Sequence, residues 1–360
     1  MEQKIKQAIK ALLFIGALFL FIFAIDLLGS GFKMLGGEFT KELISATANP
    51  ILALVIGLLA TSIVQSSSAT TVIIVGLVAS GVLGIGSAIP MIMGANIGTT
   101  VTNMIVSFSH ISRREEMGKA VGGAVVHDFF NILAVAILLP LEMFTGIIEK
   151  TATYSTSFFM SLGIEAVASP VKIVIKPLVA QAQIIIGGNA IAVIIVALVL
   201  LLLSLKQIVS TARNLVGTKM GSVLDVYLFK SAFTAFLAGL IFTAIIQSSS
   251  VTTSLVIPLV GAGLLTVRKI FPYTLGANIG TTVTAFIAAI AIGVPAGVTV
   301  AICHLLFNLL GIIILYPLKA LPIGMAEKFG YYVQKKRRIA VIFLALTFYI
   351  IPFILLIIMR

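Results

Sequence analysis

The sequence Gln-Ser-Ser-Ser occurs twice, each time inside an otherwise apolar stretch. The first copy is residues 65–68 and the second is residues 247–250. Such a run offers hydroxyl and amide groups without formal charge, which suit a small anion rich in oxygen atoms. Serine is also a favoured N-cap, so a helix that begins in the run presents its first N–H groups and the positive end of its dipole. The motif therefore predicts an anion-binding site.

A second duplicated motif supplies neutral oxygen atoms. Gly-Ala-Asn-Ile-Gly-Thr-Thr-Val-Thr stands at 94–102 and recurs unchanged at 276–284. Its glycines allow close approach of two backbones. Its polar side chains and freed backbone carbonyls are hard oxygen ligands of the kind that suits Na⁺; the side chains are Asn96, Thr99, Asn278 and Thr281. For any single residue of the motif, glycine-mediated helix packing is the alternative interpretation.

Few ionisable residues lie within the apolar stretches. Asp128, next to His127, is a candidate cation ligand or pH-sensitive group, because ionisable residues inside a membrane are usually functional. His127 and His304 are more simply interpreted as packed, hydrogen-bonded histidines. Asp26 is expected at the membrane interface.

The composition indicates a helical membrane protein. The 360 residues are 60% hydrophobic and 10% charged, with a mean hydropathy of +1.20, whereas soluble domains are about 25% charged. Stretches such as 11–29, 183–204 and 340–359 are long enough to cross a bilayer as helices and do not alternate as barrel strands would. The single cysteine, Cys303, excludes an intrachain disulfide. We expect a multi-pass protein of the cell membrane.

The two halves of the chain are copies of one unit. Both motifs recur at an offset of 182 residues, and an ungapped comparison of 57–102 with 239–284 gives 24 identities in 46 positions. A weaker match pairs His127 and Asn131 with His304 and Asn308 at an offset of 177. Internal repeats of this kind set the architecture.

The basic residues show how the two copies are oriented. The net charge of +12 is concentrated in short connections, as in membrane proteins, and does not indicate nucleic acid binding. In the first copy Arg113, Arg114 and Lys119 follow the Gly-Ala-Asn segment, whereas in the second copy Arg268 and Lys269 precede it. Because basic connections face the cytoplasm, equivalent loops lie on opposite sides. The repeats are therefore predicted to be inverted, with a cytoplasmic N-terminus.

This rule divides the chain into four parts. They are a first repeat at 1–140, with a span, a hairpin at 48–84 and spans at 88–108 and 120–140; an external connection at 141–182; a second repeat at 183–320, with a span, a hairpin at 231–265 and spans at 271–290 and 297–317; and a basic cytoplasmic loop and final span at 321–360. The predicted fold class is an all-α polytopic membrane protein with two inverted-topology repeats. Each repeat contains a re-entrant helical hairpin broken at Gln-Ser-Ser-Ser, and the two tips are expected to meet.

The absence of basic residues from the predicted membrane midplane bears on how the charge of a bound anion is balanced. No Lys or Arg is predicted at midplane depth, and a multiply charged anion without a counter-ion is costly in a medium of low dielectric constant. Bound cations would supply that charge. Co-binding of Na⁺ with the anion is therefore expected.

The paired motifs, together with Val126-His127-Asp128-Phe129-Phe130-Asn131, resemble the type II sodium-phosphate cotransporter family. The resemblance covers about 57–131 and 239–322, and the short, cysteine-free connection at 141–182 looks like a prokaryotic form. It implies import of inorganic phosphate coupled to sodium, with alternating access. It also implies that phosphate is held by Gln65, Ser66, Ser67, Ser68, Gln247, Ser248, Ser249 and Ser250, and that Na⁺ is held by Gln65, Thr70, Asn96, Thr99, Thr100, Gln247, Thr252, Asn278, Thr281 and Thr282.

Three other functions remain open at this point. The same fold could carry sulfate or another oxyanion, or could conduct an anion without sodium. An intramembrane serine hydrolase would use one serine with His127 or His304, but the chain has no Gly-x-Ser-x-Gly motif and a nucleophile need not be duplicated. A purely structural membrane protein would use its repeats only for packing.

Overall fold

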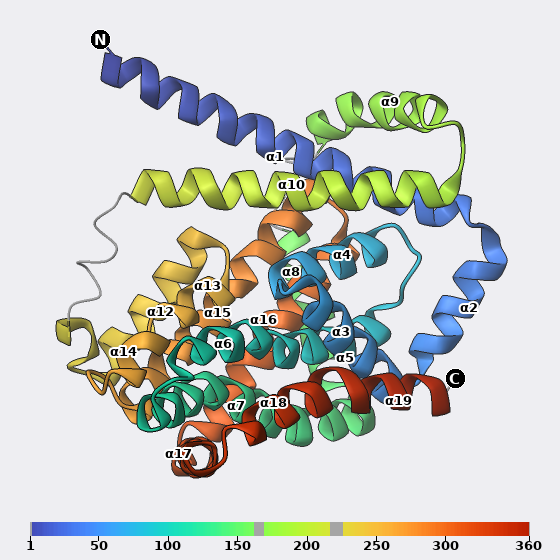
Figure 1. Cartoon of the computed structure of the whole chain (residues 1–360). Coiled ribbons are helices and arrows are strands. Elements are labelled where there is room, and N and C mark those ends of the chain that lie inside the picture. Colours follow the sequence, from blue (N-terminus) through green and yellow to red (C-terminus); the bar gives the residue numbers. More distant parts are fainter. Residues whose placement is uncertain (1, 162–168, 217–225, 360) are drawn as a thin grey trace.

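The computed structural model describes residues 2–161, 169–216 and 226–359, and within these ranges leaves out some side chains, including those of 2–11 and 209–216. The described residues form helices and no strands (Figure 1). Seven helical segments among them are long and apolar enough to cross a membrane: Ile15–Met34, Ile85–His110, Arg114–Thr145, Ala190–Ile208, Val267–Ile292, Pro295–Leu315 and Arg338–Ile358. They overlap the seven spans expected from the sequence, which confirms an all-α polytopic membrane protein.

The first half contains eight α-helices and one short 3₁₀ helix. They are α1 (Glu2–Met34), α2 (Gly36–Ala48), α3 (Pro50–Val64), α4 (Ser67–Ala79), α5 (Ile85–Gly98), α6 (Thr100–Ser107), η1 (Phe108–His110), α7 (Arg114–Thr145) and α8 (Ile147–Ser161). Helix α3 begins at Asn49, whose side chain accepts hydrogen bonds from the N–H groups of Ile51 and Leu52, with Pro50 at the first helical position. The equivalent helix of the second half begins at a capping box made by Ser231 and Thr234.

The second half repeats this order with local differences. Its elements are α9 (Ser169–Ile185), α10 (Ala190–Val216), η3 (Val226–Phe229), α12 (Ala232–Ile246), α13 (Ser249–Ser254), α14 (Ile257–Gly261), α15 (Val267–Ile292), α16 (Pro295–Leu315), α17 (Ala320–Lys335), α18 (Arg338–Ala345), the π-helical turn η4 (Leu346–Ile350) and α19 (Ile351–Ile358). The span expected to begin at 183 begins at Ala190, because Gly187 and Gly188 adopt positive φ angles and separate it from α9.

The equivalent of α4 is interrupted in the second half. Helix α13 ends after six residues and α14 follows it, with Pro258 near the start of α14. Proline has no N–H to donate to the preceding turn, so a continuous helix is disfavoured there. The first half has Gly76 at this position and keeps α4 continuous. We call α4, and α13 together with α14, the arms of the two repeats. Both arms are followed by a glycine with a positive φ angle, Gly81 at 76° and Gly263 at 77°.

Helix α3 packs against α5 as α12 packs against α15, and glycine makes both contacts possible. A Cβ atom on Gly94 would lie 1.9 Å from the carbonyl oxygen of Leu54, and one on Gly276 would lie 1.9 Å from that of Phe236. Gly57 and Gly239 face backbone carbonyls on the partner helix in the same way. These positions differ by 182 residues, so the sequence repeat is also a packing repeat.

Other helices flank these two pairs. In Figure 1, α1 and α10 lie side by side along one side of the molecule, and α18 and α19 lie along the opposite side. Helix α7 packs against α17, and α16 packs against α8. The two pairs lie between these outer helices, but α3 and α12 still expose side chains such as Ile63 and Phe233.

Candidate functional site

Each Gln-Ser-Ser-Ser motif breaks its helix at the glutamine. Gln65 ends α3 with φ and ψ of 55° and 30°, and Gln247 ends α12 with 56° and 31°. Both are in the left-handed region, and among the described residues they are the two non-glycine residues with positive φ. A residue with a Cβ costs about 1–2 kcal/mol in this conformation, and glycine would avoid that cost. The repeated choice of glutamine therefore indicates a use for its side chain.

The first serine of each motif caps the helix that follows. The Ser66 hydroxyl accepts a hydrogen bond from the N–H of Ala69 at 3.2 Å, and Ser248 accepts one from Val251 at 3.3 Å. The hydroxyls of Thr70 and Thr252 donate to the carbonyls of these two serines at 3.1 Å and 3.0 Å. The first turn of each arm is thus fixed, and its leading N–H groups face the break.

The second and third serines bring the two repeats together. The hydroxyl oxygens of Ser67 and Ser249 lie 3.5 Å apart, and the Ser68 hydroxyl donates to the carbonyl of Gln247 at 3.1 Å. Ser67, Ser68, Ser249 and Ser250 are all buried. Residues separated by 182 positions in the sequence therefore form one cluster of neutral hydrogen-bonding groups. This cluster is the candidate site.

The threonines of the second motif mostly bond within their own helices. Thr99 and Thr281 donate to the carbonyls of Ala95 and Ala277, at 3.1 Å and 3.0 Å. Thr282 donates to Ile279 at 2.7 Å, whereas its equivalent, Thr100, lies 3.1 Å from Nδ1 of His127. A hydroxyl that donates its hydrogen keeps its oxygen lone pairs, so these groups retain the capacity to bind a cation.

The two asparagines of this motif form bridges that cross between the repeats. Asn96 donates to Oδ1 of Asn308 at 3.0 Å, and its own Oδ1 lies 3.2 Å from Nε2 of His304. In the symmetric arrangement, Asn278 donates to Asn131 at 3.0 Å and lies 2.6 Å from Nε2 of His127. Each asparagine thus bonds to the His-x-x-x-Asn segment of the other repeat. We call these two groups of three residues the crossed bridges: one is Asn96 with His304 and Asn308, and the other is Asn278 with His127 and Asn131.

The interpretation of His127 and His304 as packed, hydrogen-bonded side chains agrees with these contacts, but their link to the motif asparagines was not foreseen. Asn131 and Asn308 are also additions to the expected set. The sequence did contain a signal, because His and Asn are the residues kept at the offset of 177. Another unforeseen contact joins the Thr253 hydroxyl of α13 to Oδ1 of Asn103 on α6 at 2.9 Å.

Several buried oxygen atoms near these motifs have no hydrogen-bond partner. Both carboxyl oxygens of Asp128 are in this position, and the Asp128 side chain is fully buried. The hydroxyls of Thr61 and Thr243, and those of Thr102 and Thr284, are unpartnered in equivalent places of the two repeats. Buried carboxylates are normally paired or bound to a cation. These oxygens are available to accept a hydrogen bond or to bind a cation.

The described interior holds no permanently charged basic side chain. Among the described side chains, no lysine or arginine is buried, although Asp128, Glu142 and numerous hydroxyl and amide groups are. Glu142 is occupied, because its carboxylate accepts hydrogen bonds from the N–H groups of Ile148 and Glu149. An anion at the serine cluster would therefore find hydrogen-bond donors but no protein cation beside it.

Comparison with known proteins places these features in a family. The family model described as Na+/Pi-cotransporter matches residues 20–168 and 200–349, one segment in each repeat. The rat protein named sodium-dependent phosphate transport protein 2A is 33% identical, over 98% of this chain and 68% of the relative. The human and bovine proteins named 2B are 31% and 33% identical, each over 95% of this chain and 64% of the relative. No solved structure matches the chain. The chain therefore belongs to the Na⁺/Pi-cotransporter family, whose members are transporters and not enzymes.

Proposed function

We propose that this chain is a symporter that imports inorganic phosphate with Na⁺ by alternating access. The observation that carries the proposal is the contact of Ser67 with Ser249, which joins the broken helices of both repeats in one buried polar cluster. Phosphate is held there by Gln65, Ser66, Ser67 and Ser68 of the first repeat and by Gln247, Ser248, Ser249 and Ser250 of the second. The names of the relatives support the choice of phosphate and sodium.

Hydrogen bonds from both motifs would hold the anion. The N-terminus of α4 offers backbone N–H groups and the positive end of a helix of 13 residues. Helix α13 has six residues, so its serine hydroxyls contribute more than its dipole. Ser66 and Ser248 accept bonds as caps and keep their own hydroxyl hydrogens for an oxyanion.

Sodium supplies the positive charge that the protein lacks. Candidate ligands are the oxygens of Gln65, Thr70, Asn96, Thr99, Thr100, Gln247, Thr252, Asn278, Thr281 and Thr282. Asn96 and Asn278 have a further role in the crossed bridges, so we assign the threonine and glutamine oxygens to Na⁺ first. With a cation required beside the anion, transport of phosphate is coupled to transport of sodium.

The orientation follows from the basic loops. We infer that the repeats are inverted, that the Gln-Ser-Ser-Ser arms are re-entrant, and that the N-terminus faces the cytoplasm of a cell in whose plasma membrane the protein lies. Exposure of the serine cluster first to one side and then to the other would complete the cycle. A cysteine introduced at Lys150 should react with an impermeant maleimide in intact cells, whereas one introduced at Lys328 should react only after the cells are permeabilised. Reaction of both cysteines in intact cells would contradict inversion.

Uptake into proteoliposomes tests the function. We expect accumulation of radiolabelled phosphate only with an inward sodium gradient, competition by arsenate, and no competition by sulfate, because arsenate shares the charge and protonation behaviour of phosphate. Replacing both serines, Ser67→Ala with Ser249→Ala, should lower uptake by about 100-fold, since hydrogen bonds to charged groups contribute about 1.5–3 kcal/mol each.

The matched control replaces two serines of α8, the partly exposed Ser155 and the exposed Ser157, with alanine; their hydroxyls donate to the carbonyls of Thr151 and Thr153. This variant should transport normally. Equal uptake with and without sodium would reject coupling, and competition by sulfate would favour a general oxyanion carrier.

Asp128 is the group for which a cation is most clearly needed. We expect Asp128→Asn to raise the sodium concentration for half-maximal uptake by about tenfold, because a buried charged interaction is lost. Glu142→Gln is the control, since that buried carboxylate already has two backbone partners. An unchanged sodium dependence in Asp128→Asn would remove Asp128 from the cation site.

A further inference from the structure

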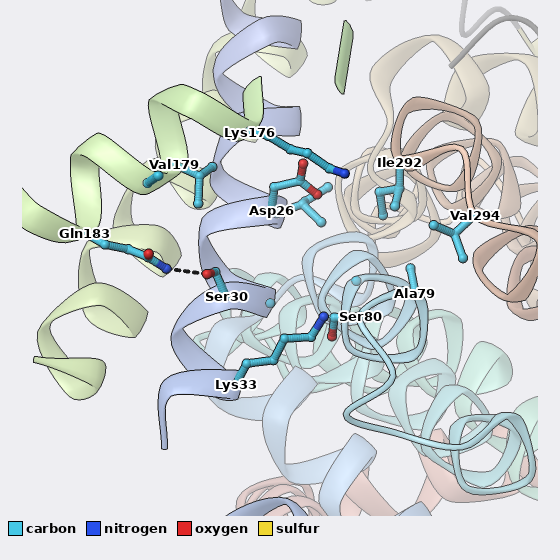
Figure 2. A pocket seen from close by; sticks show the side chains of 14 residues that line it. Asp26, Ser30, Lys33, Ala79, Ser80, Lys176, Val179, Gln183, Ile292 and Val294 are labelled. Carbon is cyan, nitrogen blue, oxygen red and sulfur yellow. Dashed lines mark hydrogen bonds between the residues drawn. The ribbon is translucent and has the colours of Figure 1, made fainter. Parts of the chain in front are cut away.

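A pocket outside the serine cluster carries a separate set of charged groups. It has a volume of about 320 Å³ and lies between α1, α9, the last turn of α4 and the end of α15 (Figure 2). Helix α1 approaches α4 closely here, because a Cβ on Gly29 would be 2.9 Å from Cβ of Ser80. One turn beyond Gly29, α1 places Lys33 at the edge of the pocket.

The polar lining comes from three helices. Helix α1 contributes Asp26, Ser30 and Lys33; α9 contributes Lys176 and Gln183; and the end of α4 contributes Ser80. The Gln183 amide donates a hydrogen bond to the Ser30 hydroxyl and retains a second N–H. Ser80 donates to the carbonyl of Leu77 at 2.9 Å. The donors left for a ligand are therefore the two ammonium groups, one amide N–H and the hydroxyl of Ser30, which accepts the bond from Gln183 and keeps its own hydrogen.

The charges in this pocket favour an anion. Figure 2 shows Lys176 and Asp26 extending into it side by side, and Lys33 extending toward Ser80. Among the described side chains that line the pocket, two ammonium groups and one carboxylate give a net charge of +1, in contrast to the core, where no described lysine or arginine is buried. Lysine binds phosphate as a point charge from a flexible stem, so two lysines on different helices can close on one phosphoryl group.

We propose that this pocket binds a singly charged phosphoryl group through Lys33 and Lys176. Two sources share this chemistry: inorganic phosphate and the head group of an anionic phospholipid. The net charge of +1 matches a single negative charge, and Asp26 disfavours a second one by like-charge repulsion.

The pocket is distinct from the serine cluster but joined to it by one helix. Ser67 begins α4 and Ser80 follows its last residue, so the two ends are about 20 Å apart at 1.5 Å per residue. A ligand between α1, α9 and α4 would contact the C-terminal end of α4, whose N-terminal end carries Ser67 and Ser68. The proposal does not depend on what the serine cluster transports.

Amine footprinting tests the proposal directly. The intact protein is placed in nanodiscs of neutral phosphatidylcholine, treated with an acetylating reagent, and its lysines are quantified by peptide mass spectrometry. One arm adds inorganic phosphate against chloride of equal ionic strength; the other replaces part of the lipid with anionic phosphatidylglycerol. We expect acetylation of Lys33 and Lys176 to slow by about fivefold or more in at least one arm. The exposed Lys41 and Lys328 are controls and should be unaffected.

The outcomes separate the sources. Protection by phosphate alone assigns the pocket to the free anion, and protection by phosphatidylglycerol alone assigns it to the head group. Protection by phosphate should persist in the Ser67→Ala, Ser249→Ala variant, and its loss there would place the effect at the serine cluster and overturn the proposal. Equal labelling of all four lysines in every arm would also overturn it. Asp26→Asn, which makes the pocket charge +2, should strengthen protection.

Discussion

Replacing Gln65 or Gln247 with glycine should stop phosphate uptake while leaving the protein at least as stable as before. Both glutamines occupy the left-handed region, where glycine is free of the cost of about 1–2 kcal/mol that a Cβ imposes. The change removes an amide that, in the proposed function, binds phosphate. Uptake should fall by about 100-fold, the loss expected for strong hydrogen bonds to a charged ligand.

Two further substitutions divide this effect into its parts. Gln65→Ala keeps the strained backbone and removes the amide, so it should be less stable than Gln65→Gly by about 1 kcal/mol and equally inactive. Gln65→Asn keeps an amide in a residue that tolerates this conformation, and should retain part of the uptake. Thermal unfolding in detergent and proteoliposome uptake give the two readouts.

An active glycine variant would show that the glutamines serve only to end their helices. A glycine variant that unfolds far below the wild type would show that the amides hold the fold. A glycine variant that is stable but inactive would show that the glutamine side chain binds the ligand and that its backbone strain is tolerated for this reason.

The sequence predicted the helical segments and the two breaks well because both signals are local. Long apolar stretches predict spans, and Gln-Ser-Ser-Ser ends one helix and caps the next through residues within four positions of one another. Because the motif is duplicated exactly, the sequence also predicted the same local structure and the same role in both repeats. The same reasoning could not place the start of α10, which depends on the conformations of Gly187 and Gly188.

The site was predicted less completely because its contacts join distant parts of the chain. Nothing local indicates that Asn96 bonds to Asn308 and His304, since those partners lie more than 200 residues away. Chemical type alone favoured an oxygen ligand for each asparagine. In the folded chain, the amides of Asn96 and Asn278 are instead hydrogen-bonded to other side chains.

Removing one crossed bridge should destabilise the protein strongly in either repeat. Asn278→Ala leaves Oδ1 of Asn131 without its donor and removes the shorter of the two contacts of Nε2 of His127, and Asn96→Ala leaves Nε2 of His304 and Oδ1 of Asn308 buried without a partner. Each orphaned group costs about 1–3 kcal/mol, so a loss of about 2–5 kcal/mol is expected for each variant. Asn189→Ala, at an exposed helix cap, should cost about 1 kcal/mol.

A double-mutant cycle can show that the energy belongs to the bridge. His127→Ala in the Asn278→Ala background should cost much less than it does alone, with a coupling of about 0.5–3 kcal/mol, measured by unfolding in detergent. Additive losses would mean that each residue acts through packing alone. Since each bridge joins one repeat to the other, a measured coupling would show that these side chains hold the two repeats together in the folded protein.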